Sequence, residues 1–121
     1  MKVNELMIGD WVLLQGKPYQ IDMLNGYQES DLGFEPIPIT IELLEKNGFE
    51  RENLITSYNH YTGIDNRVSL NDDFYYINSR DVWSVHVDSE DYCTIANCEL
   101  TYLHELQALL NICHINFEWQ V

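Results

Sequence analysis

The sequence predicts one α+β domain over 1–121: an antiparallel sheet with one short helix and a longer C-terminal helix packed on it. Three observations predict this class. The 121 residues are 45% hydrophobic, which is enough for one buried core. Aromatic and β-branched segments alternate with turn residues over much of the chain. Helical patterns occur in two places. The expected units are residues 1–36, 37–49, 54–96 and 98–114.

The first unit predicts a β-meander. Gly9-Asp10 predicts a turn before the strand Trp11–Leu14. The turn sequence Gly16–Pro18 follows this strand, and the chain returns over Tyr19–Leu24. Asn25-Gly26 is a strong hairpin signal. This succession is similar to the opening of SH3-like small barrels. Because such a barrel needs more strands than residues 1–36 supply, we expect a partial barrel.

The second unit predicts a short helix with signals at both ends. Thr40 is a suitable N-cap residue. Ile39 and Leu44 occupy the two positions of a hydrophobic staple. Gly48 fits the left-handed position after the helix, and Phe49 can then pack back on Leu44 as in a Schellman motif.

The third unit predicts antiparallel strands, notably "DDFYYIN" and "DVWSVHVD", with turns at "SLNDD", "NSRD" and "DSED". In the second strand Trp83, Val85 and Val87 alternate with polar residues, so they should face the core. His86 should face water or the edge of the sheet. After the last helix, "INFEW" could add a short strand.

The fourth unit, 98–114, predicts the longer helix, capped by Asn97 or Thr101. An apolar stripe follows helical spacing and indicates one buried face. Its members are Leu103, Leu106, Leu110 and Cys113, widened by Tyr102 and Leu109.

The same helix raises the alternative of a metal or catalytic site. His104 and His114 would lie about 80° apart and roughly 15 Å along the axis, too far to share one ion. Gln107 and Ala108 occupy the positions where a second ligand would follow His104. We therefore expect a packing helix, with no metal.

Elsewhere the chain lacks the motifs of common catalytic and cofactor sites. A zinc site drawn from His86, Cys93 and Cys98 has the spacing of no common zinc motif. No nucleophile elbow, phosphate-binding loop or dinucleotide-binding loop occurs. The sequence predicts no catalytic residues and no cofactor.

The charge disfavours several partner classes. Twenty acidic residues and six isolated basic ones give a net charge of −14. Direct binding of nucleic acid or of anionic lipid needs clustered Lys and Arg, so neither is expected. The acidity either serves solubility or attracts a basic protein, in the limit as a DNA mimic. Three cysteines without an export signal predict reduced thiols and a cytoplasmic protein.

Three blocks resemble a family of small, acidic, uncharacterised proteins of gut-type Bacteroidetes genomes and their phages or mobile elements. The blocks are "ELMIGDWVLLQGKPYQI", "EPIPITIELLEKNGFE" and "YLHELQALL". The third contains the family's aromatic-x-His-x-Leu-Gln pattern, at Tyr102, His104, Leu106 and Gln107. The chain departs from the family after this block, in "NICHINFEWQV".

The resemblance marks Tyr102, His104 and Gln107 as a structural anchor or a binding site. His104 and Gln107 are neighbours on the helix surface, three residues apart. As an anchor, His104 should be at least partly buried, with a hydrogen bond from its ring.

These observations support three functional hypotheses. The first is a non-enzymatic protein-interaction module of phage or mobile-element origin. The second is an acidic inhibitor of a basic nucleic-acid-binding or defence protein of the host. The third is a small enzyme with an unrecognised site. The first two require a protein partner, and the sequence leaves the oligomeric state open.

Overall fold

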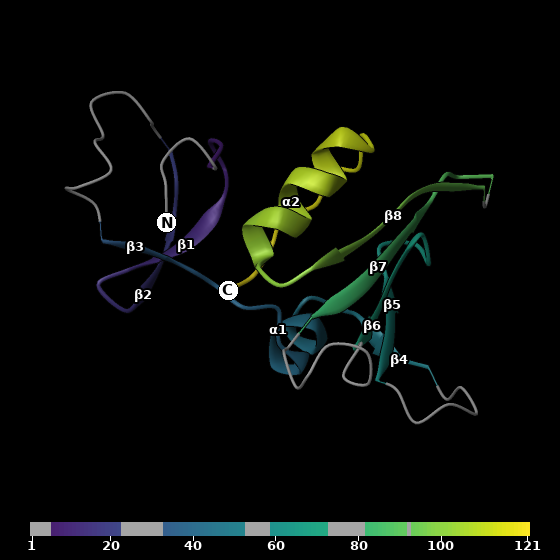
Figure 1. Ribbon diagram of the computed structural model, residues 1–121, viewed down its shortest axis with the longest axis horizontal. Helices are drawn as coiled ribbons and strands as arrows, with labels where there is room; N and C mark the ends of the chain where they lie inside the picture. The colour runs from purple at the N-terminus through teal and green to yellow at the C-terminus, as the bar shows by residue number, and fades with distance from the viewer. Residues whose placement is uncertain (1–5, 23–32, 53–58, 73–81, 92) are drawn as a thin grey trace.

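The protein is mixed α+β, as predicted, and its described residues form two antiparallel sheets and two helices (Figure 1). The computed structural model describes residues 6–22, 33–52, 59–72, 82–91 and 93–121. The elements are β1 (Trp11–Leu14), β2 (Lys17–Gln20), β3 (Phe34–Pro36), α1 (Ile41–Lys46), β4 (Glu50–Arg51), β5 (His60–Gly63), β6 (Val68–Asp72), β7 (Trp83–Asp88), β8 (Thr94–Leu100) and α2 (Leu103–Ile112). Within these ranges, no helix has the length and apolarity needed to cross a membrane.

The N-terminal sheet has the strand order β2-β1-β3, so the predicted meander is wrong in its topology. Gln15 and Gly16, with φ of 52° and 78°, join β1 to β2 as the turn of a tight hairpin. β3 then pairs with β1 and not with β2. With β1 in the centre, Val12 is fully buried beneath both neighbours. The three strands close no barrel, and the expected turn at Asn25-Gly26 lies outside the described residues.

The end signals predicted for the first helix are confirmed on α1. The Thr40 hydroxyl accepts a hydrogen bond from the Leu43 backbone N–H at 3.2 Å. Gly48 has a φ of +83°. Its N–H donates to the Glu45 carbonyl, and the Phe49 N–H donates to the Leu44 carbonyl. These two bonds are those of a Schellman motif.

The larger sheet is an antiparallel meander, β4-β5-β6-β7-β8. The turn predicted at "SLNDD" is wrong, because Val68–Asp72 forms the central strand β6, where pairing on both sides buries Val68 and Leu70. On β7, Trp83, Val85 and Val87 face the core as predicted. The turn at "DSED" is also confirmed. Most of "DDFYYIN" and the turn "NSRD" lie among residues that the structure does not describe.

The C-terminal helix is shorter than the predicted 98–114. Residues up to Leu100 belong to β8, because they pair with β7 in regular antiparallel register. α2 therefore begins at Leu103, after the N-cap Tyr102, and ends at the C-cap Cys113. His114 has a φ of 59° and leaves the helix. "INFEW" forms no strand.

The main core lies between the larger sheet, α1, α2 and the C-terminal tail. α2 turns Leu103, Leu106 and Leu110 into this core, as the apolar stripe predicted. Ile115 and Trp119 of the tail are buried there as well. A second, smaller core lies under the N-terminal sheet, formed by Leu6, Val12, Ile21 and Phe34.

Candidate functional site

An apolar groove lies between α2 and β8. The groove exists because side chains on the core face are fully buried on β7 but only half-buried on the edge strand β8. Residues paired directly across antiparallel strands point to the same face. The fully buried row on β7 thus faces the core together with a row on β8 that is only half-buried. The pairs are Trp83 with Leu100, Val85 with Cys98, and Val87 with Ala96.

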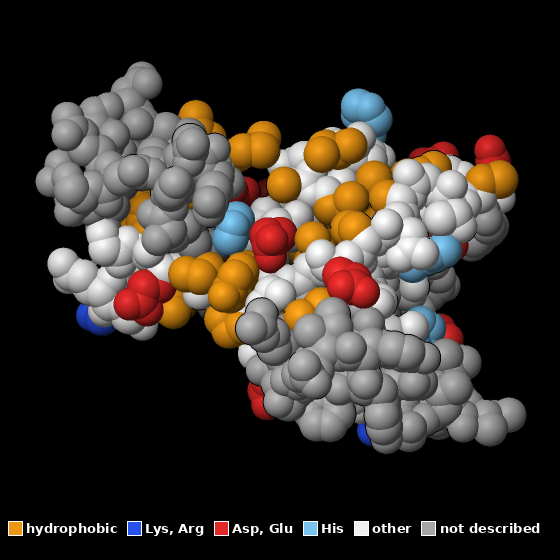
Figure 2. Space-filling view, viewed as in Figure 1, with side chains coloured by type: hydrophobic (Ala, Val, Ile, Leu, Met, Phe, Trp, Pro, Cys, Tyr) orange, Lys and Arg blue, Asp and Glu red, His pale blue; other side chains and the backbone are white. Residues whose placement is uncertain are grey.

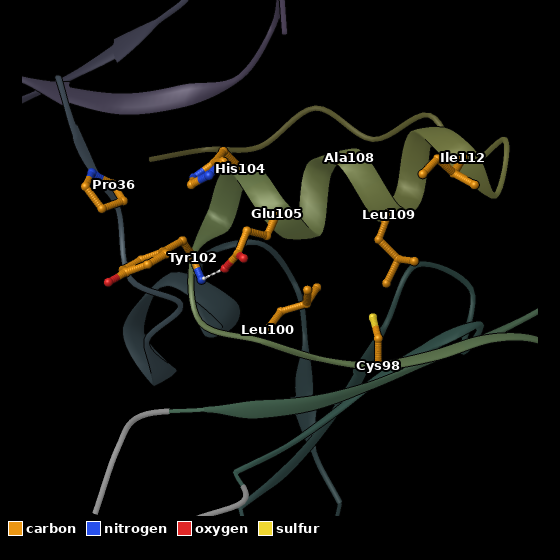
Figure 3. A pocket seen from close by; sticks show the side chains of 9 residues that line it. All are labelled: Pro36, Cys98, Leu100, Tyr102, His104, Glu105, Ala108, Leu109 and Ile112. Atoms are coloured by element: carbon orange, nitrogen blue, oxygen red, sulfur yellow. Dashed lines mark hydrogen bonds between the residues drawn. The ribbon is translucent and has the colours of Figure 1, made fainter. Parts of the chain in front are cut away.

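The groove, called the α2/β8 groove below, holds about 610 Å³. Cys98 and Leu100 point into it from β8, and Ala108, Leu109 and Ile112 line it from α2 (Figure 3). Ile112 is 75% exposed although it is a large apolar residue.

One end of the groove is aromatic and polar. The rings of Tyr102 and His104 stack with centroids 6.0 Å apart and planes 11° from parallel. Glu105 lies beside them, and its Oε1 accepts a hydrogen bond from the backbone N–H of Tyr102 at 2.9 Å (Figure 3). The backbone N–H of Thr101 donates to the same oxygen at 3.2 Å. This carboxylate caps the start of α2 and places a negative charge in the groove.

His104 is buried, with 7% of its surface exposed. Its Nδ1 atom does not make the hydrogen bond that was expected of an anchor. Nδ1 is buried and has no hydrogen-bond partner among the described residues. The ring of His104 instead stacks on Tyr102.

Gln107 makes the anchoring bonds instead. Its Oε1 accepts from the Trp11 backbone N–H at 2.9 Å, and its Nε2 donates to the Gly9 carbonyl at 2.9 Å. These bonds tie α2 to the start of β1. The three residues marked by the sequence pattern therefore divide: Tyr102 and His104 line the α2/β8 groove, whereas Gln107 joins the helix to the N-terminal sheet.

Asp10 is a buried carboxyl group that the sequence reasoning treated only as part of a turn. It is 1% exposed, and its Oδ2 accepts from the Met7 backbone N–H at 2.8 Å. Burial raises the pKa of Asp10 above its usual value of 3.8, and the Met7 bond and the charge of His104 oppose the rise. The Gly9-Asp10 pair gave no sign of burial, because burial here depends on α2, about a hundred residues further along the chain.

The thiol in the groove is not activated. Burial raises the pKa of Cys98, and the nearby Cys113 and Glu105 raise it further. A raised pKa leaves less thiolate, so Cys98 is a poor nucleophile at neutral pH.

The zinc set drawn from the sequence is divided between two faces of the sheet. Cys98 lies on the core face opposite Val85, whereas His86 lies on the other face, where its Nε2 is 3.1 Å from the Thr94 hydroxyl. Over the described ranges, no three His, Cys, Asp or Glu side chains are placed to share a metal ion.

The charged residues around the groove are mainly acidic. Both of its main walls come from residues 81–121, which contain seven Asp and Glu and no Lys or Arg. Figure 2 shows hydrophobic side chains gathered between α2 and β8 with acidic side chains beside them, while Lys and Arg in that view lie at the periphery. A ligand with positive charge next to apolar groups would complement this surface.

No family model, curated protein or solved structure matches this chain. The resemblance to the Bacteroidetes and phage family therefore stays a prediction.

Proposed function

We propose that this protein is a non-enzymatic protein-interaction module whose α2/β8 groove receives an apolar segment of a partner protein. The observation that carries the proposal is the half-buried row Ala96, Cys98 and Leu100, which lies directly across from a fully buried row on β7. Apolar surface left beside a finished core gains free energy when a partner covers it, by about 25 cal/mol for each Å² removed from water.

The chemistry of the groove favours binding over catalysis. Its one carboxylate, Glu105, already accepts two backbone hydrogen bonds, and its thiol, Cys98, has a raised pKa. The ring of His104 makes no hydrogen bond to either group among the described residues. A nucleophile and a base within hydrogen-bond reach are the usual signature of covalent catalysis, and the described lining of the groove contains no such pair.

The cell biology proposed with this function follows the sequence. We place the module in the cytoplasm, because all three cysteines are free thiols and free thiols persist in reducing compartments. The resemblance to phage and mobile-element proteins supplies the proposed origin.

An acidic inhibitor of a basic host protein is the second candidate. The charge distribution favours it, because the last 41 residues carry seven carboxylates and no basic side chain. Binding of this kind rests on charge complementarity, so it should weaken steeply as salt rises. Binding in an apolar groove should lose much less affinity over the same rise in salt.

One pair of variants on α2 tests the groove. Ala108→Arg places a long charged side chain in the groove, and Asn111→Arg adds the same charge at an exposed position on the same helix, outside the groove. Immobilised parent and variants are incubated with lysate of a host bacterium, and the captured proteins are identified and quantified by mass spectrometry.

The proposal predicts a partner that Asn111→Arg retains and Ala108→Arg loses by at least about tenfold, with retention in about 0.5 M salt. A partner that both variants retain equally would refute the groove. A partner lost from the parent at that salt concentration would favour the acidic inhibitor.

A further inference from the structure

β8 differs from every other edge strand of the described sheets. Exposed edges are usually protected by shortness, by Lys or Pro, or by charge, because an unpaired edge is a template for another strand. β2 carries Lys17 and Pro18, and β3 is short and ends in Pro36. β4 has only two residues, and both are charged.

β8 has none of these protections along most of its length. It is seven residues long, contains no Lys or Pro, and has Glu99 as its one charged residue. It is the last strand of its sheet, and no described strand pairs with its outer edge. A register shift at Ile95 interrupts the pairing with β7, but Ala96–Leu100 is regular. This stretch presents backbone donors and acceptors that an added strand could use.

The edge and the groove are parts of one surface. A strand added beside β8 would turn alternate side chains to the face that carries Ala96, Cys98 and Leu100, which is the face toward α2. Those side chains would enter the α2/β8 groove (Figure 3). The remaining side chains would lie on the other face, beside Asn97 and Glu99, which are both exposed.

Charge decides what kind of strand fits. Glu105 lies in the groove, Glu99 is exposed on β8, and Glu90 and Asp91 are exposed at the turn before it. With no Lys or Arg anywhere in 81–121, this surface attracts cationic chains. A second copy of the protein is disfavoured as the added strand, because each copy carries a net charge of −14.

We propose that the outer edge of β8 binds an extended cationic segment of another protein by strand addition, with alternate apolar side chains in the α2/β8 groove and Lys or Arg beside Glu99 and Glu105. This inference rests on the proposed function and names the kind of partner and its mode of binding. Main-chain hydrogen bonds would supply affinity, and the groove would supply side-chain specificity.

Short synthetic peptides test the mode directly. The parent probe has alternating Val and Thr between two pairs of Lys, and an acidic version has Glu in place of Lys. Two further versions carry N-methyl groups on one or the other set of alternate amides, which removes the donors along one edge of the strand. Binding is measured by fluorescence anisotropy, and the contact surface is mapped by NMR on the isotope-labelled protein.

Strand addition predicts that the cationic probe binds and that the acidic one does not. The NMR chemical-shift changes on binding should be concentrated in β8 and in Ala108, Leu109 and Ile112. One methylated version should lose binding while the other keeps it. Any other pattern with the methylated pair, or no binding by the cationic probe, overturns the inference.

A matched pair of charge reversals completes the experiment. Glu99→Lys reverses an exposed charge on β8, and Glu50→Lys reverses an exposed charge on the opposite edge of the same sheet. Glu99→Lys should lower the affinity for the cationic probe by about two- to fivefold, and Glu50→Lys should leave this affinity unchanged. Equal effects of the two reversals would contradict the assignment to β8.

The failure of strand addition is distinguishable from the failure of the proposed function. An amphipathic helical peptide with Lys on its polar face that binds in the groove, while the extended probes do not, would overturn strand addition and leave the module intact. Sedimentation that shows a dimer broken by Glu99→Lys would assign the edge to a second copy and overturn the inference. The capture experiment with Ala108→Arg stands independently of both results.

Discussion

Gln107 on α2 and Trp11 on β1 are joined by a side-chain to backbone hydrogen bond of 2.9 Å across 96 residues of sequence. The same amide group donates to the Gly9 carbonyl, so one side chain holds both sides of the turn that precedes β1. The N-terminal sheet is thereby fixed to the helix that forms one wall of the α2/β8 groove.

Gln107→Ala should lower the free energy of unfolding by about 1–3 kcal/mol, because the half-buried Trp11 N–H loses its acceptor. The Gly9 carbonyl keeps a partner, since the Gln20 side chain also donates to it at 3.1 Å. Urea denaturation followed by fluorescence measures the loss. The exposed neighbour Asn111, changed to Ala, should stay within about 0.5 kcal/mol of the parent. Equal stability of the two variants would show that the Gln107 bonds contribute nothing.

Asp10→Asn should stabilise the protein at neutral pH. Because burial raises the folded-state pKa of Asp10 above its usual value of 3.8, the contribution of this group is fully present below pH 3.8 and is lost as pH rises through the folded pKa. An amide can still accept the Met7 hydrogen bond and does not ionise. The gain over the parent should therefore be largest near pH 7 and should shrink toward pH 3.5. A gain that grew with falling pH would mean that the carboxylate is stabilised in the fold.

Gly63→Ala should destabilise the protein at least as much as Gly48→Ala, and for a different reason. A Cβ at Gly63 would lie 2.7 Å from Cδ1 of Phe49, whose ring stacks on Trp119 with centroids 5.8 Å apart and so has little room to move. Overpacking of this kind costs about 1–3 kcal/mol.

At Gly48 a Cβ meets nothing within 4 Å, and the cost comes only from the left-handed φ of +83°, about 1–2 kcal/mol. Thermal denaturation of both variants makes the comparison. Phe49→Leu should remove part of the clash that Gly63→Ala creates. The double variant should therefore lose less stability than the sum of the losses of the two single variants. Strict additivity would exclude the clash as the cause.

The thiols of Cys93 and Cys98 should differ in reactivity. Burial raises the pKa of Cys98, whereas Cys93 is exposed. Iodoacetamide at pH 8 should therefore label Cys93 first and Cys98 much more slowly, as followed by mass spectrometry over time. A ligand in the α2/β8 groove should slow the labelling of Cys98 further and leave the labelling rate of Cys93 unchanged. Labelling of Cys98 at the rate of Cys93 would contradict its burial beside α2.

Local signals in the sequence predicted local structure well. The ends of α1 were predictable because the cap at Thr40 and the Schellman motif at Phe49 each involve only residues a few positions apart in the sequence. The inward face of β7 followed from strict alternation. The α+β class followed from the succession of strand and helix patterns.

Features that depend on distant pairing could not be predicted in this way. "CEL" in β8 belongs to a strand because β7 pairs with it, although the same letters continue a helical pattern. The order β2-β1-β3 depends on which side of β1 the returning chain takes. Gln107 was marked by the sequence pattern, but its partners lie at the other end of the chain. The groove was not predicted, because it reflects what the fold leaves uncovered on β8.

Amide hydrogen exchange of β8 tests the central claim most directly. The protein is measured alone and with its captured partner or the cationic probe, and protection is resolved along Thr94–Leu100. If the α2/β8 groove and the outer edge of β8 bind the partner, alternate amides of β8 should exchange at least about tenfold more slowly in the complex, while β4 stays unchanged. Protection on β4 or on the N-terminal sheet, with β8 exchanging as in the free protein, would contradict the claim.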